Sequence, residues 1–262
     1  MHNFACNLKA VGGYENLLAF ALDEEALSWG QATGLPVVHI PTISDRSKGQ
    51  IHYGTPRYKT VTKLKSLSTL KVLEMGFSVI FSDPDVVWYA NPFRLVDFRT
   101  ADVVIQSDSE TKRTITRHPN SGLYFVSASE RTLGAFRAIV IQAKKQHGMS
   151  EQPNFRTVLC MKRVRARCFY SPLLHNSSQT FMPDSSVTTT DFLPLESFPN
   201  GGFRIRGGVG VFDLTPAEFE SATGKPLLAA HCNYIVGVKA KIKQLQAHGD
   251  WHLMNGKCIA EQ

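Results

Sequence analysis

The chain has 262 residues, of which 43% are hydrophobic and 19% are charged. This length fits one large α/β domain or two small ones, and this composition excludes wholesale disorder. The formal charge of +7 is compatible with an anionic ligand, but the densest basic run, Lys162–Arg167, lacks the interleaved aromatic residues of a nucleic-acid-binding motif. We therefore expect a packed domain that does not bind nucleic acid.

Leu17–Ala21 and Pro36–Ile40 are short apolar runs, and Asp23 caps a helix between them that continues through Trp29. This order is a β-α-β unit, which is typical of parallel sheets. We therefore expect an α/β fold in which helices flank a mostly parallel central sheet.

The next predicted elements lead to a pair of carboxylates. After a polar loop over residues 41–56, apolar spacing predicts a helix over Lys59–Met75, and Phe77–Phe81 is then a strand. Asp83 and Asp85 follow this strand directly. In open α/β sheets, ligands bind outside the carboxyl ends of the strands, so this position favours a functional role for the pair.

The second half of the chain contains further predicted strands and helices. Ala101–Gln106 and Ser121–Val126 are predicted strands, and Asp108 follows the first of them. The later predictions are two helices (Leu133–Lys145 and Asn154–Lys162), a strand (Arg163–Tyr170), a long Ser/Thr-rich loop (171–191) and a basic helix (Lys239–His248). No repeat or linker is evident, so we expect a single domain over residues 1–262.

The five cysteines leave the disulfide pattern open. None belongs to a CxxC pair, so a structural zinc site is not expected. The odd number means that at least one thiol is free or pairs with another chain, and the sequence does not reveal the redox compartment. One N-glycosylation triplet occurs, at residues 176–178.

No membrane segment is expected in this chain. No apolar run approaches the ~20 residues that span a bilayer, and the polar first ten residues are too short for a signal peptide. Two interpretations follow: the chain is soluble as it stands, or it is a fragment of a longer protein whose targeting segment lies upstream.

Two carboxylates that stand one residue apart can both reach one cation. Carboxylate and water oxygens suit Mg²⁺ or Mn²⁺, and such an ion usually carries a diphosphate as its remaining ligands. A solvated turn is the competing interpretation, because it also avoids burying an unpaired charge. Alone, the sequence Asp83-Pro84-Asp85 leaves both interpretations open.

The stretch Gly76–Trp88, closed by Asn91–Phe93, resembles the D-x-D region of the nucleotide-diphospho-sugar transferase family, which includes the plant and algal glycosyltransferase family 77 enzymes. Further blocks in family order span residues 14–251. They are Lys65 in the preceding helix, Asn120–Val126, Glu151–Pro153, Leu193-Pro194 with Phe198–Gly201, and His231–Asn233 with Gly237 and Lys239.

This resemblance implies a fold and an activity. The fold would be a single GT-A type, Rossmann-like domain. The activity would be transfer of a sugar from a nucleotide diphosphate donor, in this family most often a UDP-sugar, to a hydroxyl of a glycan or glycoprotein. Mn²⁺ or Mg²⁺ would assist, with retention at the anomeric carbon, and the location would be the Golgi lumen. Galactose, xylose and arabinofuranose donors occur in the wider family, so the sugar is not fixed.

The resemblance also implies which residues bind the metal and the diphosphate. Asp83, Asp85 and His231 would hold the metal, although His231 could instead be a structural histidine. Lys65 and Lys239 would meet the nucleotide or its diphosphate, with an exposed helix surface as the competing role.

On the sugar side, Asp108 would accept hydrogen bonds from donor hydroxyls, and Asn120 and Gly122 would line the pocket. Glu151 and Gln152 would face the sugar opposite the leaving group. Simple turn, packing and helix-capping roles compete with these assignments. No catalytic base is assigned, because the leaving phosphate oxygen can itself take the proton of the acceptor.

Two features depart from the family pattern. Pro84, in the middle of the D-x-D, fixes φ and removes an N–H. The chain also starts about where the family's first strand should end, so Phe4-Ala5-Cys6 would be a remnant of that strand, or the strand would be missing. Both departures support an alternative function, a non-catalytic member that binds a glycan or a partner. Trp88 and Trp251 are candidates to stack on sugars, although buried packing is the commoner role of tryptophan.

Overall fold

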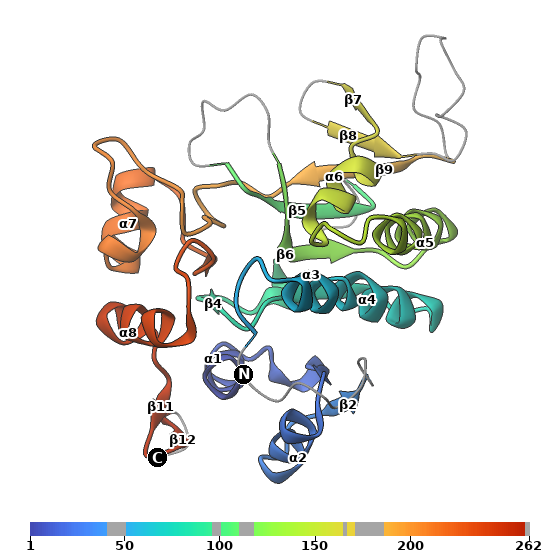
Figure 1. Cartoon of the computed structure of the whole chain (residues 1–262). Coiled ribbons are helices and arrows are strands. Elements are labelled where there is room, and N and C mark those ends of the chain that lie inside the picture. Colours follow the sequence, from blue (N-terminus) through green and yellow to red (C-terminus); the bar gives the residue numbers. More distant parts are fainter. Residues whose placement is uncertain (41–50, 96–100, 110–117, 165–166, 171–185, 260–262) are drawn as a thin grey trace.

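The computed structural model describes residues 1–40, 51–95, 101–109, 118–164, 167–170 and 186–259. Its centre is a six-stranded sheet, with a smaller N-terminal unit and a C-terminal helical part beside it (Figure 1). The glycosylation triplet and most of the predicted loops over 41–56 and 171–191 lie outside the described residues.

The N-terminal unit contains the predicted β-α-β arrangement. It consists of β1 (Ala19–Ala21), α2 (Glu24–Ala32) and β2 (Val37–His39), and the two strands pair in parallel. The Asp23 carboxylate accepts a hydrogen bond from the Ala26 N–H at 2.7 Å and so caps α2. This prediction is confirmed locally, but β1 and β2 form a sheet of their own.

Of the two expectations for the start of the chain, the strand remnant at residues 4–6 is wrong, because these residues belong to a helix, α1 (His2–Ala10). Phe4 and Leu8 are four residues apart and therefore lie on one face of α1. Both are buried in a cluster with Val86 and Trp88. Packing of this apolar face thus fixes the segment as a helix.

The central sheet has the order β3-β6-β5-β9-β8-β7. Of its five pairings among the described residues, only β5–β9 is parallel, so the expected mostly parallel sheet is in fact mixed. The reason is that β6 runs antiparallel between β3 and β5, and β7 and β8 form a hairpin. The strands are β3 (Val79–Ser82), β5 (Val103–Ser107), β6 (Pro119–Val126), β7 (Lys162–Val164), β8 (Arg167–Tyr170) and β9 (Thr188–Phe192).

Helices α4, α5 and α6 pack on one face of this sheet (Figure 1). The sequence prediction of one helix over 59–75 corresponds to two, α3 (Pro56–Thr62) and α4 (Leu64–Glu74). Tyr124 and Val126 of β6 point to this face, whereas Leu123 and Phe125 point to the other. The other two helices are α5 (Glu130–Lys145) and α6 (Gln152–Leu159).

The opposite face of the sheet is covered by α1 and by an antiparallel pair of strands, β4 (Val86–Trp88) and β10 (Ala229–His231). A third cluster of buried apolar side chains, which includes Phe203, Val211 and Phe219, forms the core of the C-terminal part of the chain. The remaining elements are the 3-10 helices η1 (Tyr14–Asn16), η2 (Pro92–Arg94) and η4 (Val211–Asp213), helices α7 (Pro216–Thr223) and α8 (Val238–His248), and the hairpin of β11 (Leu253–Met254) and β12 (Lys257–Cys258).

Two disulfides tie this architecture together. Cys6–Cys258 joins α1 to β12, and Cys160–Cys168 joins the end of α6 to β8. Cys232 is a buried free thiol, which is one of the two outcomes that the odd number of cysteines allowed. Among the described residues, no helix combines the length and the apolar character that a membrane crossing needs.

Candidate functional site

All the predicted site residues except Lys239 line one large cavity of about 2530 Å³. Its polar wall is formed where β3 and β5 end and where β6 begins. Because β6 is antiparallel to both, its first residues lie at the same edge of the sheet, with Asn120 opposite Gln106 and Leu123 opposite Ser82. The mixed sheet is therefore what brings Asn120 and Gly122 beside the aspartates.

The two aspartates lie in a tight turn between β3 and β4. The Val86 N–H donates to the Asp83 carbonyl at 3.1 Å, and Asp83 donates its own N–H to the Gly122 carbonyl at 2.7 Å. Pro84 thus occupies the second position of a four-residue turn, where a fixed φ and a missing N–H are favourable. The proline is compatible with both carboxylates on the cavity wall.

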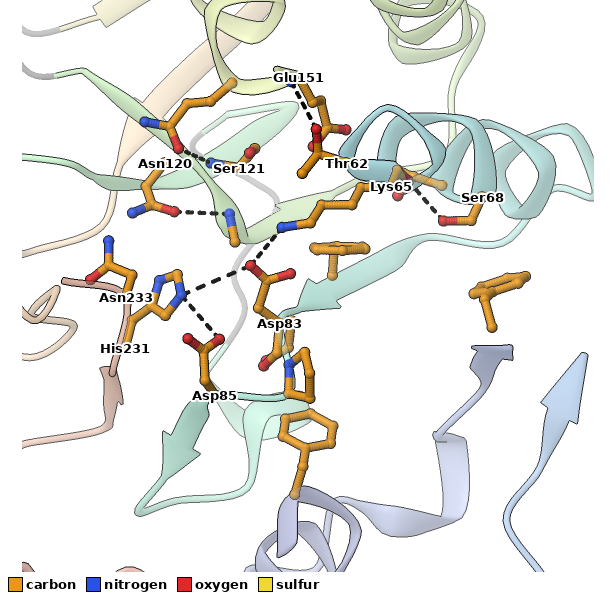
Figure 2. A pocket seen from close by; sticks show the side chains of 18 of the residues that line it. Thr62, Lys65, Ser68, Asp83, Asp85, Asn120, Ser121, Glu151, His231 and Asn233 are labelled. Carbon is orange, nitrogen blue, oxygen red and sulfur yellow. Dashed lines mark hydrogen bonds and ion pairs between the residues drawn. The ribbon is translucent and has the colours of Figure 1, made fainter. Parts of the chain in front are cut away.

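His231 stands opposite the aspartates because β10 pairs with β4, which places His231 beside Val86. Its Nε2 is 3.4 Å from Asp85 Oδ1 and 3.9 Å from Asp83 Oδ2. Figure 2 shows the three side chains pointing toward one another. Each offers one potential metal-ligand atom, and these atoms all lie within 4.8 Å of one another.

The orientation of the His231 ring is set by a buried glutamine. The Gln106 amide nitrogen donates to the carbonyls of Phe198 and Pro199, both at 3.1 Å. Its oxygen therefore faces His231 and accepts from Nδ1 at 2.8 Å. With Nδ1 as the donor, Nε2 carries either a lone pair available to a cation or a proton shared with Asp85. Such an outer partner is typical of a metal-binding histidine.

The segment Phe198–Gly201 supports this arrangement from behind. The Asn200 side-chain amide donates to the carbonyls of Ser107 and Ser109 at 2.8 and 2.9 Å. The His231 N–H donates to the Pro199 carbonyl at 3.1 Å. This block, which the sequence predicted only as a resemblance, therefore holds the end of β5 and the end of β10 in register.

Two lysines neutralise the two aspartates. Lys65, near the start of α4, donates to Asp83 Oδ2 at 2.6 Å, and Lys241 on α8 forms an ion pair with Asp85 Oδ2. Burial alone would lower the pKa of Lys65, but Asp83 and Glu151 raise it to about 12. Burial would raise the pKa of Asp85, but His231 and Lys241 hold it well below its ordinary value.

Asp108 is the centre of a group of amide side chains. Its carboxylate accepts hydrogen bonds from Asn120 and Gln152, both at 2.9 Å, and from Asn233 at 3.3 Å. The Asn120 oxygen in turn accepts the Gly122 N–H at 2.9 Å. This group lies on the cavity wall next to the metal-ligand cluster. It brings together Asp108, Asn120 and Gln152 as the sequence proposed, and it adds Asn233.

Gly122 is required by close packing. A Cβ at this position would lie 2.2 Å from His231 Cε1 and 2.8 Å from Asp83 Oδ2. Because Gln106 holds the His231 ring and Lys65 holds Asp83, neither group is free to move aside. Gly122 also lines the cavity, so both roles considered from the sequence apply to it.

Glu151 lines the cavity, and its expected role at the sugar face stays a prediction. Its side chain is fully buried, and neither carboxylate oxygen has a hydrogen-bond partner among the described residues. Burial raises the pKa of Glu151 to about 8, against the opposing charge of Lys65. Figure 2 places Glu151 beside Thr62.

Three further candidate residues differ in their exposure and in their position relative to the cavity. Lys239 is exposed and is not among the described residues that line the cavity. Trp88 is only 1% exposed and packs against Phe125, so it cannot stack on a sugar. Trp251 is half-buried and does line the cavity.

Sequence reasoning missed Lys241 and Gln106. Lys241 lies four residues before the buried Leu245 and therefore shares the inward face of α8, whereas Lys239 does not. That spacing was a usable signal. Gln106 is the last residue but one of β5 and carried no signal, because its role depends on contacts with Phe198, Pro199 and His231 that are distant in sequence.

The sequence matches the family described as nucleotide-diphospho-sugar transferase over residues 12–245. It is 31% identical over 254 residues to a beta-arabinofuranosyltransferase of Arabidopsis thaliana, covering 95% of this chain and 44% of that protein. It is 22% identical over 220 residues to UDP-D-xylose:L-fucose alpha-1,3-D-xylosyltransferase 1 of the same plant, covering 82% and 56%. The chain thus spans about half the length of these relatives.

Among solved structures, the fold is similar to that of a glycosyltransferase involved in the glycosylation of the major capsid of PBCV-1. The TM-score is 0.42 and the identity is 9%, with 88% of this chain and 97% of that chain covered.

Proposed function

Because the chain belongs to the nucleotide-diphospho-sugar transferase family, we propose that it transfers a sugar from a nucleotide diphosphate donor to a hydroxyl of a glycan or glycoprotein, with the help of a divalent cation. The observation that carries this proposal is the convergence of Asp83, Asp85 and His231 on the cavity wall. These residues come from two distant parts of the chain, so their convergence is not a consequence of sequence spacing.

The donor set fits a divalent cation. Two carboxylates and one imidazole, with Nδ1 of that imidazole engaged by Gln106, are ligands that suit Mn²⁺ or Mg²⁺. When bound, such a cation would stabilise the negative charge that develops on the leaving diphosphate. Asp83, Asp85 and His231 would hold it.

The remaining residues would serve the diphosphate and the sugar. Lys65 would supply positive charge to the diphosphate, and its hydrogen bond to Asp83 would keep it in position. Asp108 would accept hydrogen bonds from sugar hydroxyls, since the amides that surround it fix its orientation without using all its lone pairs. Asn120 and Gln152 would present their amides, and Gly122 its backbone, to the same pocket.

We propose a UDP-pentose as the donor. This rests on the relatives, which are an arabinofuranosyltransferase and a UDP-xylose-dependent transferase by name. The reaction would retain the anomeric configuration, with the leaving phosphate oxygen taking the proton of the acceptor hydroxyl. Accordingly, no base from the protein is required.

A Golgi lumen location is part of this proposal. Two disulfides, Cys6–Cys258 and Cys160–Cys168, support an oxidising compartment, because disulfides rarely persist in the cytosol. Enzymes that build extracellular glycans act in such a compartment.

The test is donor turnover by the purified chain. UDP release from UDP-xylose, UDP-arabinofuranose and UDP-galactose would be followed with Mn²⁺ and with a chelator, beside an Asp85→Asn variant. We expect release from at least one pentose donor, with Mn²⁺ only, and at least about a hundredfold slower in the variant. A folded wild-type protein that releases no UDP from any donor, with or without acceptor sugars, would favour the non-catalytic glycan-binding alternative.

A further inference from the structure

We propose that Lys241 competes with the divalent cation for Asp85, and that a nucleoside diphosphate relieves this competition by drawing the Lys241 ammonium to its own phosphates. The metal and the nucleotide would therefore strengthen each other's binding. The inference rests on the proposed donor site and deepens it, because it assigns Lys241 a role in coupling the two ligands.

The contacts of Asp85 are the first argument. Its Oδ2 is taken by the Lys241 ammonium, and its Oδ1 is 3.4 Å from His231 Nε2. The side chains of Lys241 and Asp85 are only 27% and 17% exposed, so water screens this pair less than a surface ion pair. A cation that uses Asp85 Oδ2 as a ligand must first displace Lys241.

The charge of the site is the second argument. Asp83 and Asp85 contribute two negative charges, and Lys65 and Lys241 contribute two positive charges. With His231 neutral, these five side chains have no net charge to attract a divalent cation. A nucleoside diphosphate brings several negative charges and so offers the lysines new partners.

The third argument separates the two lysines. Lys65 is held by Asp83 at 2.6 Å and also lies over the Phe81 ring, 5.8 Å from its centroid. For Lys241, by contrast, Asp85 is the one carboxylate partner among the described residues. Lys241 also lies on the cavity wall beside Gly237 and Val238. Lys241 is therefore the lysine that can swing from a carboxylate to a phosphate at the lower cost.

The experiment measures Mn²⁺ affinity directly, from the free Mn²⁺ signal in electron paramagnetic resonance, with and without UDP. It compares the wild-type chain with Lys241→Met, which keeps the length of the side chain and removes its charge. Lys243→Met is the matched control, because Lys243 is exposed on the same helix and is not among the described residues that line the cavity. Thermal unfolding establishes that each variant is folded.

In the absence of UDP, Lys241→Met should bind Mn²⁺ about tenfold more tightly than the wild type, and Lys243→Met should match the wild type. After correction for the Mn²⁺ that UDP binds in buffer, UDP should strengthen Mn²⁺ binding by a larger factor in the wild type than in Lys241→Met, in which only direct ligation by the phosphates remains. Lys241→Arg, which retains the charge, should behave as the wild type does.

Equal or weaker Mn²⁺ binding by Lys241→Met without UDP would overturn the inference. This comparison needs no nucleotide, so it distinguishes the inference from the proposed function. If the wild type binds Mn²⁺ but no UDP, the donor site is contradicted, whereas the tighter Mn²⁺ binding of Lys241→Met would still support the competition at Asp85.

Discussion

At position 122, the backbone of β6 passes directly beneath the ring of His231, so that even one methyl group has no room. We predict that Gly122→Ala weakens Mn²⁺ binding at least about tenfold while the chain stays folded, because the methyl group must displace His231 or Asp83 from the ligand cluster. Calorimetric titration of Mn²⁺ measures this.

Gly134→Ala is the control for this substitution. Gly134 lies inside α5, and a Cβ there meets nothing within 4 Å. It should leave Mn²⁺ binding unchanged and stabilise the chain by about 0.5–1 kcal/mol, since alanine favours the helix. Mn²⁺ binding by Gly122→Ala equal to that of Gly134→Ala would show that the crowding at position 122 does not govern the site.

Glu151 predicts a pH dependence of stability. Its pKa is about 8 in the folded chain, against an ordinary value of 4.5. Between these values the unfolded chain releases a proton that the folded chain keeps. The contribution of Glu151 to the free energy of unfolding should therefore fall as pH rises through this range, by up to ~1.4 kcal/mol per pH unit, and that contribution should be constant below it.

Glu151→Gln removes this titration. Urea unfolding at about pH 5 and about pH 8 should show a smaller loss of stability in the variant than in the wild type, and the variant should be the more stable of the two at about pH 8. The same slope in both proteins would mean that Glu151 is ionised in the folded chain throughout this range.

The sequence identified residues of the candidate site where a local pattern pointed to them. Asp83 and Asp85 stand at a strand end, and His231 was found through a block of family resemblance. Glu151 lines the cavity but is fully buried, which the sequence motif did not indicate. Its neighbour Gln152 is the one that reaches Asp108.

At the scale of elements, the strands and helices were largely predictable, but their pairing was not. The β-α-β unit over residues 17–40 is real, and β3, β5, β6 and α5 lie near their predicted ranges. Extending that unit to a mostly parallel sheet failed, because strand order depends on long-range pairing. Nothing local to Pro119–Val126 indicates that β6 inserts antiparallel between β3 and β5.

The same pairing explains why the site could be only partly predicted. The position of His231 depends on the pairing of β10 with β4, whose partners are separated by more than half of the chain. The blocks of resemblance conveyed that these residues belong together. They did not convey that Gln106 orients the ring or that Lys241, rather than Lys239, meets Asp85.

At the scale of the whole molecule, the family membership predicted from these blocks is confirmed by the match over residues 12–245. The sequence did not predict which cysteines form disulfides. Cys6–Cys258 closes the chain across a separation of 252 residues, whereas Cys160–Cys168 spans 8.

We therefore predict that replacing both Cys6 and Cys258 by serine lowers the free energy of unfolding by about 2–5 kcal/mol, because the unfolded chain gains the entropy of a very long loop. The double replacement of Cys160 and Cys168 should cost less, since it opens a short loop. Urea unfolding of the two double variants gives the comparison. The reverse order would mean that local packing of the cystines outweighs loop entropy.

The central claim is that Asp83, Asp85 and His231 hold a cation that in turn holds a nucleoside diphosphate. It is tested most directly by calorimetric titration of UDP into the wild type, Asp85→Asn and Asp23→Asn, each with and without Mn²⁺. Asp23→Asn is the matched control, because asparagine caps a helix about as well as aspartate. The account predicts Mn²⁺-dependent UDP binding in the wild type and in Asp23→Asn, and its loss in Asp85→Asn. UDP binding that is unaffected by Mn²⁺ and unchanged in a folded Asp85→Asn would contradict it.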